Sequence, residues 1–132
     1  MVSPDIMTTA LKTFLVEDSP VIRDSLVAAL EEMAPVQVVG IAEDERSAVE
    51  WLSAAEPRCD LVIVDIFLKG GSGLGVLRAA NDLHRPMTLV VLSNYATPDI
   101  RRKCAALGAS RVFDKSNEID ALIGYCEQLA AA

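Results

Sequence analysis

Five polar side chains that could do chemistry each follow an apolar segment of the sequence. They are Glu17 and Asp18 after the first such segment, Asp65 after the third, Ser93 at the end of the fourth and Lys115 after the fifth. Three neighbouring carboxylates repel one another unless a cation joins them. Carboxylate oxygens suit Mg²⁺, which binds one or two carboxylates together with waters and a phosphoryl oxygen. With an ammonium and a hydroxyl group nearby, the set is suited to in-line transfer of a phosphoryl group to a carboxylate.

Asp65 is the predicted nucleophile of this set. It comes directly after Leu-Val-Ile-Val, and a carboxylate next to so apolar a run is hard to bury without a partner. Each of the other groups has an ordinary alternative role. The pair Glu17-Asp18 could be a solvated strand end and helix cap, Ser93 a turn residue and Lys115 a surface lysine. The presence of reactive groups at four strand ends together favours a common site.

The elements that must position these groups form five repeated units of an apolar strand followed by an amphipathic helix. Strands are expected at residues 11–17, 36–42, 60–65, 87–92 and 110–114. In the first helix one apolar face is predicted, made of Ile22, Leu26, Ala29, Leu30 and Met33. The second helix is expected from about Glu45 to Ala55, and the third from Leu74 to a point before Pro86. The fourth is expected after Pro98, and the last around residues 119–126.

Parallel strands need helical crossovers of this kind, so the pattern predicts an open, doubly wound α/β sheet with helices on both faces. Ligands of such sheets bind beyond the carboxyl ends of the strands. The five polar side chains are therefore expected to meet at that edge.

Length and composition limit the class of protein. The chain has 132 residues, 52% of them hydrophobic and 23% charged, which predicts one globular domain. A net charge of −7 would be repelled by phosphate backbones, so direct nucleic-acid binding is not expected. No apolar run reaches the ~18 residues of a membrane span, and the start lacks a signal-peptide core. A cytoplasmic protein without membrane contact is expected.

The cysteines and the one histidine point to no site of their own. The three cysteines have neither zinc-site spacing nor an even number, which predicts reduced, half-buried core thiols at Cys59, Cys104 and Cys126. His84 is the sole histidine, which excludes a multi-histidine metal site, and it is expected to cap the end of the third helix.

Three further features are interpreted structurally. The stretch 70–75 matches neither the dinucleotide nor the P-loop pattern and is expected to be a loop before the third helix. Trp51 is expected to be partly buried packing. The sequence Arg101-Arg102-Lys103 is either a solvated face of the fourth helix or a docking site for an acidic partner.

Four motifs, in this order and spacing, give the chain a family resemblance. They are VEDSPVIRDSL, CDLVIVDIFLKGGSGL, LVVLSNYA and GASRVFDKS. From about Thr13 to Leu129 the sequence resembles the receiver domain of two-component response regulators. The resemblance implies a flavodoxin-like (βα)5 fold with five parallel strands in the order 2-1-3-4-5. It also implies a single receiver domain at residues 11–132. Residues 1–10 have no periodicity and are expected to form a flexible lead-in. The chain is either a stand-alone receiver, which is the favoured hypothesis, or an excised domain.

The resemblance also assigns roles to residues. Asp65 would be the phosphorylated aspartate, Ser93 the switch hydroxyl and Lys115 the lysine that pairs with the phosphoryl group. Glu17 and Asp18 would hold Mg²⁺ (or Mn²⁺) together with Asp65. The backbone carbonyl of Phe67 would be a further ligand of the metal.

The activity implied is acceptance of a phosphoryl group from a sensor histidine kinase, a phosphotransfer protein or a small phosphodonor. The chain would catalyse this transfer and the later hydrolysis itself, without being a conventional enzyme. Phosphorylation would switch the face formed by the fourth helix, fifth strand and fifth helix, which controls a downstream protein partner. A homodimer through the fourth and fifth helices is an open alternative.

The chain departs from the family pattern at several positions. The switch aromatic that lies three residues before the lysine is replaced by Val112, and Phe113 should point to the other side of its strand. Tyr95 or backbone shifts are therefore expected to carry the signal. Ser116 follows Lys115 where proline is usual. Two large aromatics, Phe67 and Tyr95, are expected to flank the phosphoryl site, limit attacking water and slow self-dephosphorylation.

Two other functions are alternatives to a phosphorylatable switch. A pseudo-receiver would keep the fold but signal without phosphate, and the replacement at Val112 together with the missing proline favours it. A phosphatase of the haloacid dehalogenase type also forms an aspartyl phosphate, but it needs a second aspartate two residues after the nucleophile. Phe67 occupies that position, which disfavours the phosphatase.

Overall fold

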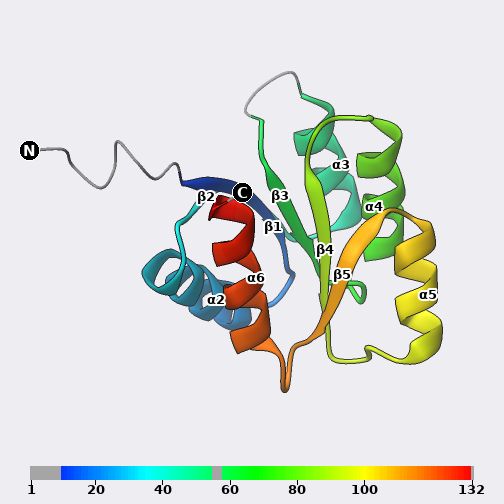
Figure 1. Ribbon diagram of the computed structural model, residues 1–132. Coiled ribbons are helices and arrows are strands. Elements are labelled where there is room, and N and C mark those ends of the chain that lie inside the picture. Colours follow the sequence, from blue (N-terminus) through cyan, green and yellow to red (C-terminus); the bar gives the residue numbers. More distant parts are fainter. Residues whose placement is uncertain (1–9, 55–57, 132) are drawn as a thin grey trace, which may run out of the picture.

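The computed structural model describes residues 10–54 and 58–131, in which strands and helices alternate along the chain (Figure 1). The strands are β1 (Leu11–Val16), β2 (Val36–Ala42), β3 (Leu61–Val64), β4 (Thr88–Ser93) and β5 (Ala109–Asp114). The helices are α2 (Pro20–Met33), α3 (Glu45–Ser53), α4 (Gly73–Asp82), α5 (Pro98–Ala106) and α6 (Ile119–Ala131). All neighbouring strands pair in parallel in the order β2-β1-β3-β4-β5. The predicted fold class and strand order are confirmed.

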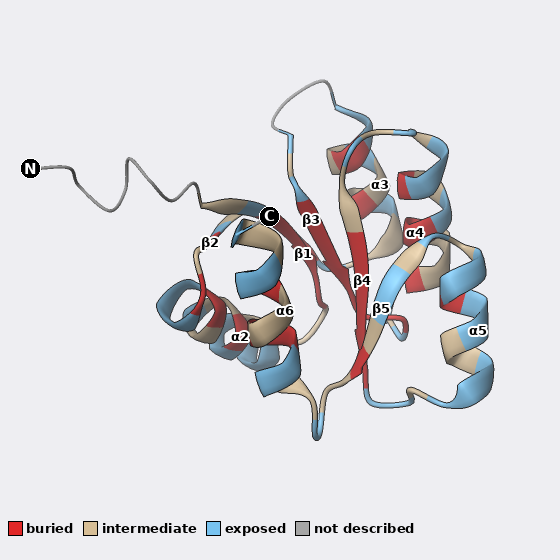
Figure 2. Cartoon of the chain, in the orientation of Figure 1, coloured by how far each residue is buried: buried red, intermediate tan, exposed pale blue. Residues whose placement is uncertain are grey.

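Helices cover both faces of the sheet, and each face has its own apolar core (Figure 2). Helices α3, α4 and α5 pack on one face, and α2 and α6 pack on the other. The four residues of β3 are fully buried because their side chains alternate between the two cores. Val62 and Val64 belong to the first core, and Leu61 and Ile63 belong to the second.

Polar side chains begin four of the helices just beyond the carboxyl ends of the strands. The N-cap residues accept a hydrogen bond from a backbone N–H of the first turn, and they are Ser19, Asp44, Ser72 and Thr97. Proline occupies the first helical position of α2 and α5, where its missing N–H costs no hydrogen bond. The caps fix the residue at which each of these helices begins.

Two residues of the predicted apolar face of α2 are exposed. Leu26 and Leu30 are buried, whereas Ile22 is 39% and Met33 58% exposed. Ile22 lies at the start of the helix and lines a surface groove with Ile119. Met33 is the last helical residue, and Ala34, in an extended conformation after it, fills that end of the core instead.

Several smaller predictions are also corrected by the structure. Helix α4 begins at Gly73 rather than Leu74, and α3 ends at Ser53. The predicted helical residue Ala55 lies outside the described residues, as does the lead-in apart from Ala10. Cys104 and Cys126 are fully buried rather than half-buried, and only Cys59 is intermediate.

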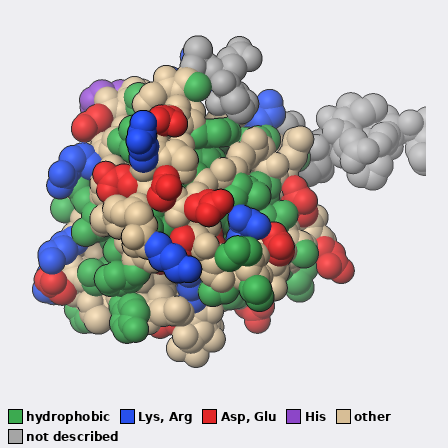
Figure 3. All heavy atoms as spheres, turned by 180° about the vertical axis from the view of Figure 1, so that it is seen from behind, with side chains coloured by type: hydrophobic (Ala, Val, Ile, Leu, Met, Phe, Trp, Pro, Cys, Tyr) green, Lys and Arg blue, Asp and Glu red, His purple; other side chains and the backbone are tan. Residues whose placement is uncertain are grey.

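Surface features agree with the composition. Figure 3 shows acidic side chains mixed with basic and apolar ones on the face drawn, without a continuous basic surface. No helix in the described part of the chain is long and apolar enough to cross a membrane.

An aromatic stack joins β1 to α3 across the edge strand β2. The rings of Phe14 and Trp51 are parallel, with centroids 4.0 Å apart. A Cβ atom on Gly40 of β2 would lie 2.4 Å from the Trp51 ring. The stack therefore requires glycine at this position, because the indole cannot move without leaving Phe14.

Replacement Gly40→Ala is expected to lower the free energy of unfolding by about 1–3 kcal/mol, since the added methyl group overpacks the stack. Urea unfolding followed by Trp51 fluorescence would measure this loss. The matched control is Gly124→Ala in the interior of α6, where a Cβ atom meets nothing within 4 Å. That change is expected to stabilise the protein by about 0.5–1 kcal/mol. Equal effects of the two substitutions would contradict the close packing described.

Candidate functional site

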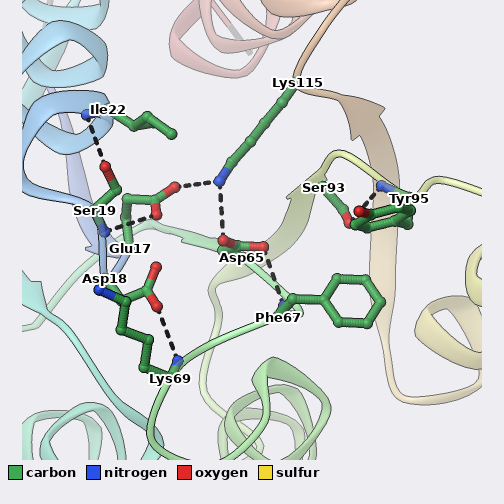
Figure 4. A network of polar contacts seen from close by, with 10 residues as sticks. All are labelled: Glu17, Asp18, Ser19, Ile22, Asp65, Phe67, Lys69, Ser93, Tyr95 and Lys115. Carbon is green, nitrogen blue, oxygen red and sulfur yellow. Dashed lines mark hydrogen bonds and ion pairs between the residues drawn. The ribbon is translucent and has the colours of Figure 1, made fainter.

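Four loops at the carboxyl edge of the sheet bring together all five predicted polar side chains (Figure 4). Each backbone is held by the neighbouring strand. The N–H of Glu17 donates to Ala42, that of Asp65 donates to Val16, and that of Lys115 donates to Ser93. The sheet pairing thus continues to the functional residues themselves, so their backbones are fixed although they lie at strand ends.

The ammonium group of Lys115 lies between two buried carboxylates. Its Nζ is 2.9 Å from Asp65 Oδ2 and also pairs with Glu17 Oε1. The three side chains are 9%, 9% and 2% exposed for Lys115, Asp65 and Glu17, respectively. Burial alone would lower the pKa of Lys115, but its hydrogen bonds to Glu17 and Asp65 outweigh burial and raise it. The lysine is therefore charged at neutral pH.

The three carboxylates form one cluster. An oxygen atom from each of Glu17, Asp18 and Asp65 lies within 4.8 Å of the other two. Each carboxylate also accepts a hydrogen bond from a backbone N–H, given by Ser19, Lys69 and Phe67 in that order. Lys115 is one cationic group beside three carboxyl groups. The all-oxygen donor set of the cluster fits Mg²⁺ or Mn²⁺.

Helix α4 approaches the backbone of Asp65 closely because it starts with glycine. The N–H of Gly73 donates to the carbonyl of Ile66 at 2.9 Å. A Cβ atom on Gly73 would lie 2.1 Å from the carbonyl oxygen of Asp65. The glycine-rich stretch, expected only to be a loop, thus also allows α4 to pack against the candidate nucleophile.

Ser93, Phe67 and Tyr95 lie on the side of Asp65 that faces away from Glu17 and Asp18 (Figure 4). Ser93 is fully buried, and its Oγ accepts a hydrogen bond from the N–H of Tyr95 at 3.1 Å. The rings of Phe67 and Tyr95 meet edge to face, with centroids 5.2 Å apart (Figure 4). Their side chains are 50% and 63% exposed, so the pair forms an apolar rim beside the site.

The two residues at the altered switch position point to opposite faces of β5, as expected from strand alternation. Val112 packs against the core beneath α3, α4 and α5, whereas Phe113 is buried in the core beneath α2 and α6. Phe113 therefore cannot take the place of an aromatic at position 112.

Replacement Lys115→Met leaves the carboxylates of Glu17 and Asp65 buried without their cation. The free energy of unfolding is expected to fall by about 3 kcal/mol in urea with a chelator present. Added Mg²⁺ should recover part of the loss, because a dication can replace the ammonium charge. A suitable control is Lys103→Met, whose lysine is 58% exposed and pairs only at the surface. That change should cost no more than about 0.5 kcal/mol.

The pH dependence of this difference follows from the raised pKa of Lys115. A raised pKa contributes stability that is complete below the unfolded-state pKa of about 10.4 and is lost as pH rises through the folded-state value. The difference between wild type and Lys115→Met should therefore be constant at neutral pH and shrink in strongly alkaline solution. Equal stability of the two proteins at neutral pH would show that the ion pairs contribute nothing.

Comparisons with known proteins show the family of this chain. The family model of the response regulator receiver domain matches residues 13–127. Protein-glutamate methylesterase/protein-glutamine glutaminase 2 of Vibrio vulnificus is 30% identical over 125 residues, which are 91% of this chain and 35% of that protein. The probable transcriptional regulatory protein NarL of Mycobacterium tuberculosis is 30% identical over 94 residues, 71% of this chain and 43% of that protein.

Solved structures show the same fold. The signal receiver domain of the putative response regulator NarL from Mycobacterium tuberculosis has a TM-score of 0.81 at 24% identity, covering 94% of this chain and 98% of that one. The response regulator domain of Thermotoga maritima CheB has a TM-score of 0.79 at 21% identity, covering 93% and 98%. The chain spans about a third of the length of the first curated relatives that it matches. It belongs to the response regulator receiver domain family.

Proposed function

We propose that Asp65 accepts a phosphoryl group from a phosphohistidine of a sensor kinase or phosphotransfer protein. The observation that carries this proposal is the buried carboxylate of Asp65, held by Lys115 within an acidic cluster. Phosphorylation then alters the face formed by α5, β5 and α6, which are the fourth helix, fifth strand and fifth helix of the sequence prediction. A downstream protein partner reads this change.

The chain's residues have distinct parts in the transfer. An oxygen of Asp65 attacks phosphorus in line, a P–O bond forms, and the electron pair of the P–N bond returns to the donor imidazole. Lys115 stabilises the phosphoryl oxygens, and the hydroxyl of Ser93 turns from Tyr95 to donate to them. Mg²⁺ (or Mn²⁺), held by Glu17, Asp18, Asp65 and the carbonyl of Phe67, would neutralise phosphoryl charge when bound.

An apolar groove beside the site supports docking of a donor protein. It runs between the start of α2 and the start of α6, and it reaches Lys115. Val21 is 77% exposed in this groove, beside Ile22 and Ile119. Exposed apolar side chains next to an acceptor suit contact with the helices of a phosphotransfer domain.

The other hypotheses receive less support. A pseudo-receiver needs none of the acidic cluster, yet the chain has a complete set of five polar groups in contact or close together. The altered residues at 112 and 116 lie outside that set. A phosphatase of the haloacid dehalogenase type is disfavoured by Phe67, which cannot act as a general acid. Direct nucleic-acid binding is disfavoured by the net charge of −7.

The proposal predicts one phosphoryl adduct when the protein is incubated with Mg²⁺ and a small acyl phosphate. Intact mass would show the adduct on the wild type and none on Asp65→Ala. Chelation of the metal should also abolish it. An adduct that persists in Asp65→Ala would refute the assignment of the acceptor. If neither an acyl phosphate nor sensor-kinase donors give an adduct, the pseudo-receiver is the better account.

The aromatic rim predicts a long-lived phosphoryl group. Phe67→Asn opens the rim to water and should shorten the lifetime of the phosphorylated protein up to about tenfold, or ~1.4 kcal/mol in the barrier. Loss of the adduct by mass over time gives the rate. Met33→Asn, at an exposed apolar residue of the far end of α2, is the control and should leave the lifetime unchanged. An unaltered lifetime in Phe67→Asn would contradict the shielding role.

A further inference from the structure

Arg101 joins three segments of the face next to the site. From the first part of α5 its guanidinium donates from Nε to the carbonyl of Ala96 at 3.0 Å and from Nη1 to the carbonyl of Val112 at 2.8 Å. Its Nη2 donates to Glu118 Oε1 at 3.1 Å. The rigid guanidinium can make all three bonds at once because its donors point in fixed, different directions.

Glu118 carries this link to the turn that holds Lys115. Its Oε1 also accepts from the N–H of Asp114 at 2.9 Å, and its own N–H donates to the carbonyl of Asp114 at 2.8 Å. The turn from residue 114 to residue 118 is therefore closed by Glu118. The N–H of Lys115 in turn donates to the carbonyl of Ser93. A continuous set of bonds thus connects Arg101, the turn and the end of β4.

The neighbouring basic residues do not share this role. Arg102 is 72% exposed and pairs with Asp99 of the same helix, and Lys103 pairs with the same aspartate. The basic patch of the sequence therefore divides into two residues that pair only within their own helix and one arginine, 42% exposed, that bonds to other segments. Three hydrogen bonds, two of them to main-chain carbonyls, are more than a solvated surface position requires.

We propose that Arg101 is a positioning residue that holds the loop after β4 and the turn after β5 in the unphosphorylated arrangement; this inference rests on the proposed phosphoryl acceptor. The hydroxyl of Ser93 is bonded to Tyr95 in the same loop. Turning the hydroxyl toward Asp65 breaks that bond, and the loop that follows Ser93 is held by Arg101 through the carbonyl of Ala96. Arg101 therefore opposes the switch and transmits it to β5 when it occurs.

The bond from Arg101 to the carbonyl of Val112 links α5 to the altered switch position of β5. Val112 stands where the family has its switch aromatic, and its neighbour Phe113 cannot take that position, since it faces the other core. Arg101 contacts the main chain at this same point of β5. The link between the site and the face thus runs through a guanidinium and carbonyl oxygens rather than through a rotating ring.

Beryllofluoride with Mg²⁺, which mimics an aspartyl phosphate, provides the test. Arg101→Met removes the three hydrogen bonds and should raise the affinity for beryllofluoride about fivefold or more, the lower end of ordinary coupling between sites. Arg101→Lys, which keeps the charge but fewer donors, should give an intermediate affinity. Arg102→Met is the matched control on the same helix and should bind as the wild type does. Wild-type or weaker affinity in Arg101→Met would overturn the proposal.

Hydrogen exchange in the protein without ligand gives an independent readout. The amides of Tyr95 and Lys115 should exchange faster in Arg101→Met than in Arg102→Met, and unchanged exchange would overturn the proposal. If the wild type binds no beryllofluoride, the proposed function fails. The exchange measurement still tests whether Arg101 holds the loop and the turn. Should Arg101→Met not fold, Glu118→Ala removes one of the three bonds of Arg101 together with the bond that Glu118 accepts from Asp114, and it should also raise the affinity. No gain would refute the positioning role of Arg101.

Discussion

The ammonium group of Lys115 lies between the carboxylates of Glu17 and Asp65, and this charge balance governs the site. Two buried carboxylates so close together would repel each other without a cation. One lysine pairs with both of them, and Asp18 adds a third carboxyl group to the cluster. The remaining carboxylate oxygens form a donor set that fits a divalent cation.

The sheet makes this balance possible. Strands β1, β3 and β5 end at the same edge, and main-chain bonds between neighbouring strands extend to the charged residues themselves. Polar caps start α2 and α5 within a few residues of β1 and β4, so little free loop separates these strands from their helices. The apolar cores on both faces fix the strands, and the chemistry is carried by residues that add little to those cores.

Much of this arrangement could be predicted from the sequence, because it depends on period and order. Runs of apolar residues predicted the five strands. The polar residues at the ends of these runs predicted the candidate site residues. Strand alternation correctly separated Val112 from Phe113. The burial of residues near the ends of a helix was harder to predict. A helical wheel places Ile22 and Met33 on the inner face of α2, but it does not show where the sheet stops beneath the helix.

Contacts to main-chain atoms were beyond sequence reasoning. Arg101 looks like its exposed neighbours in the sequence, since its acceptors are carbonyls of Ala96 and Val112 that any residue could supply. Gly73 is one of several glycines in a stretch that predicts a loop, and its close approach to the backbone of Asp65 is visible only in the structure. Both residues depend on how separate segments meet in space.

The most direct test of the account is a heteronuclear NMR titration of the ¹⁵N-labelled protein, first with Mg²⁺ and then with beryllofluoride. Mg²⁺ alone should shift the amides of Glu17, Asp18 and Asp65. Beryllofluoride should then shift Ser93 and Lys115 and extend the changes along β5 to α5. Shifts confined to residues away from this edge would contradict a phosphoryl switch centred on Asp65. Beryllofluoride-induced shifts that persist in Asp65→Ala would contradict it as well.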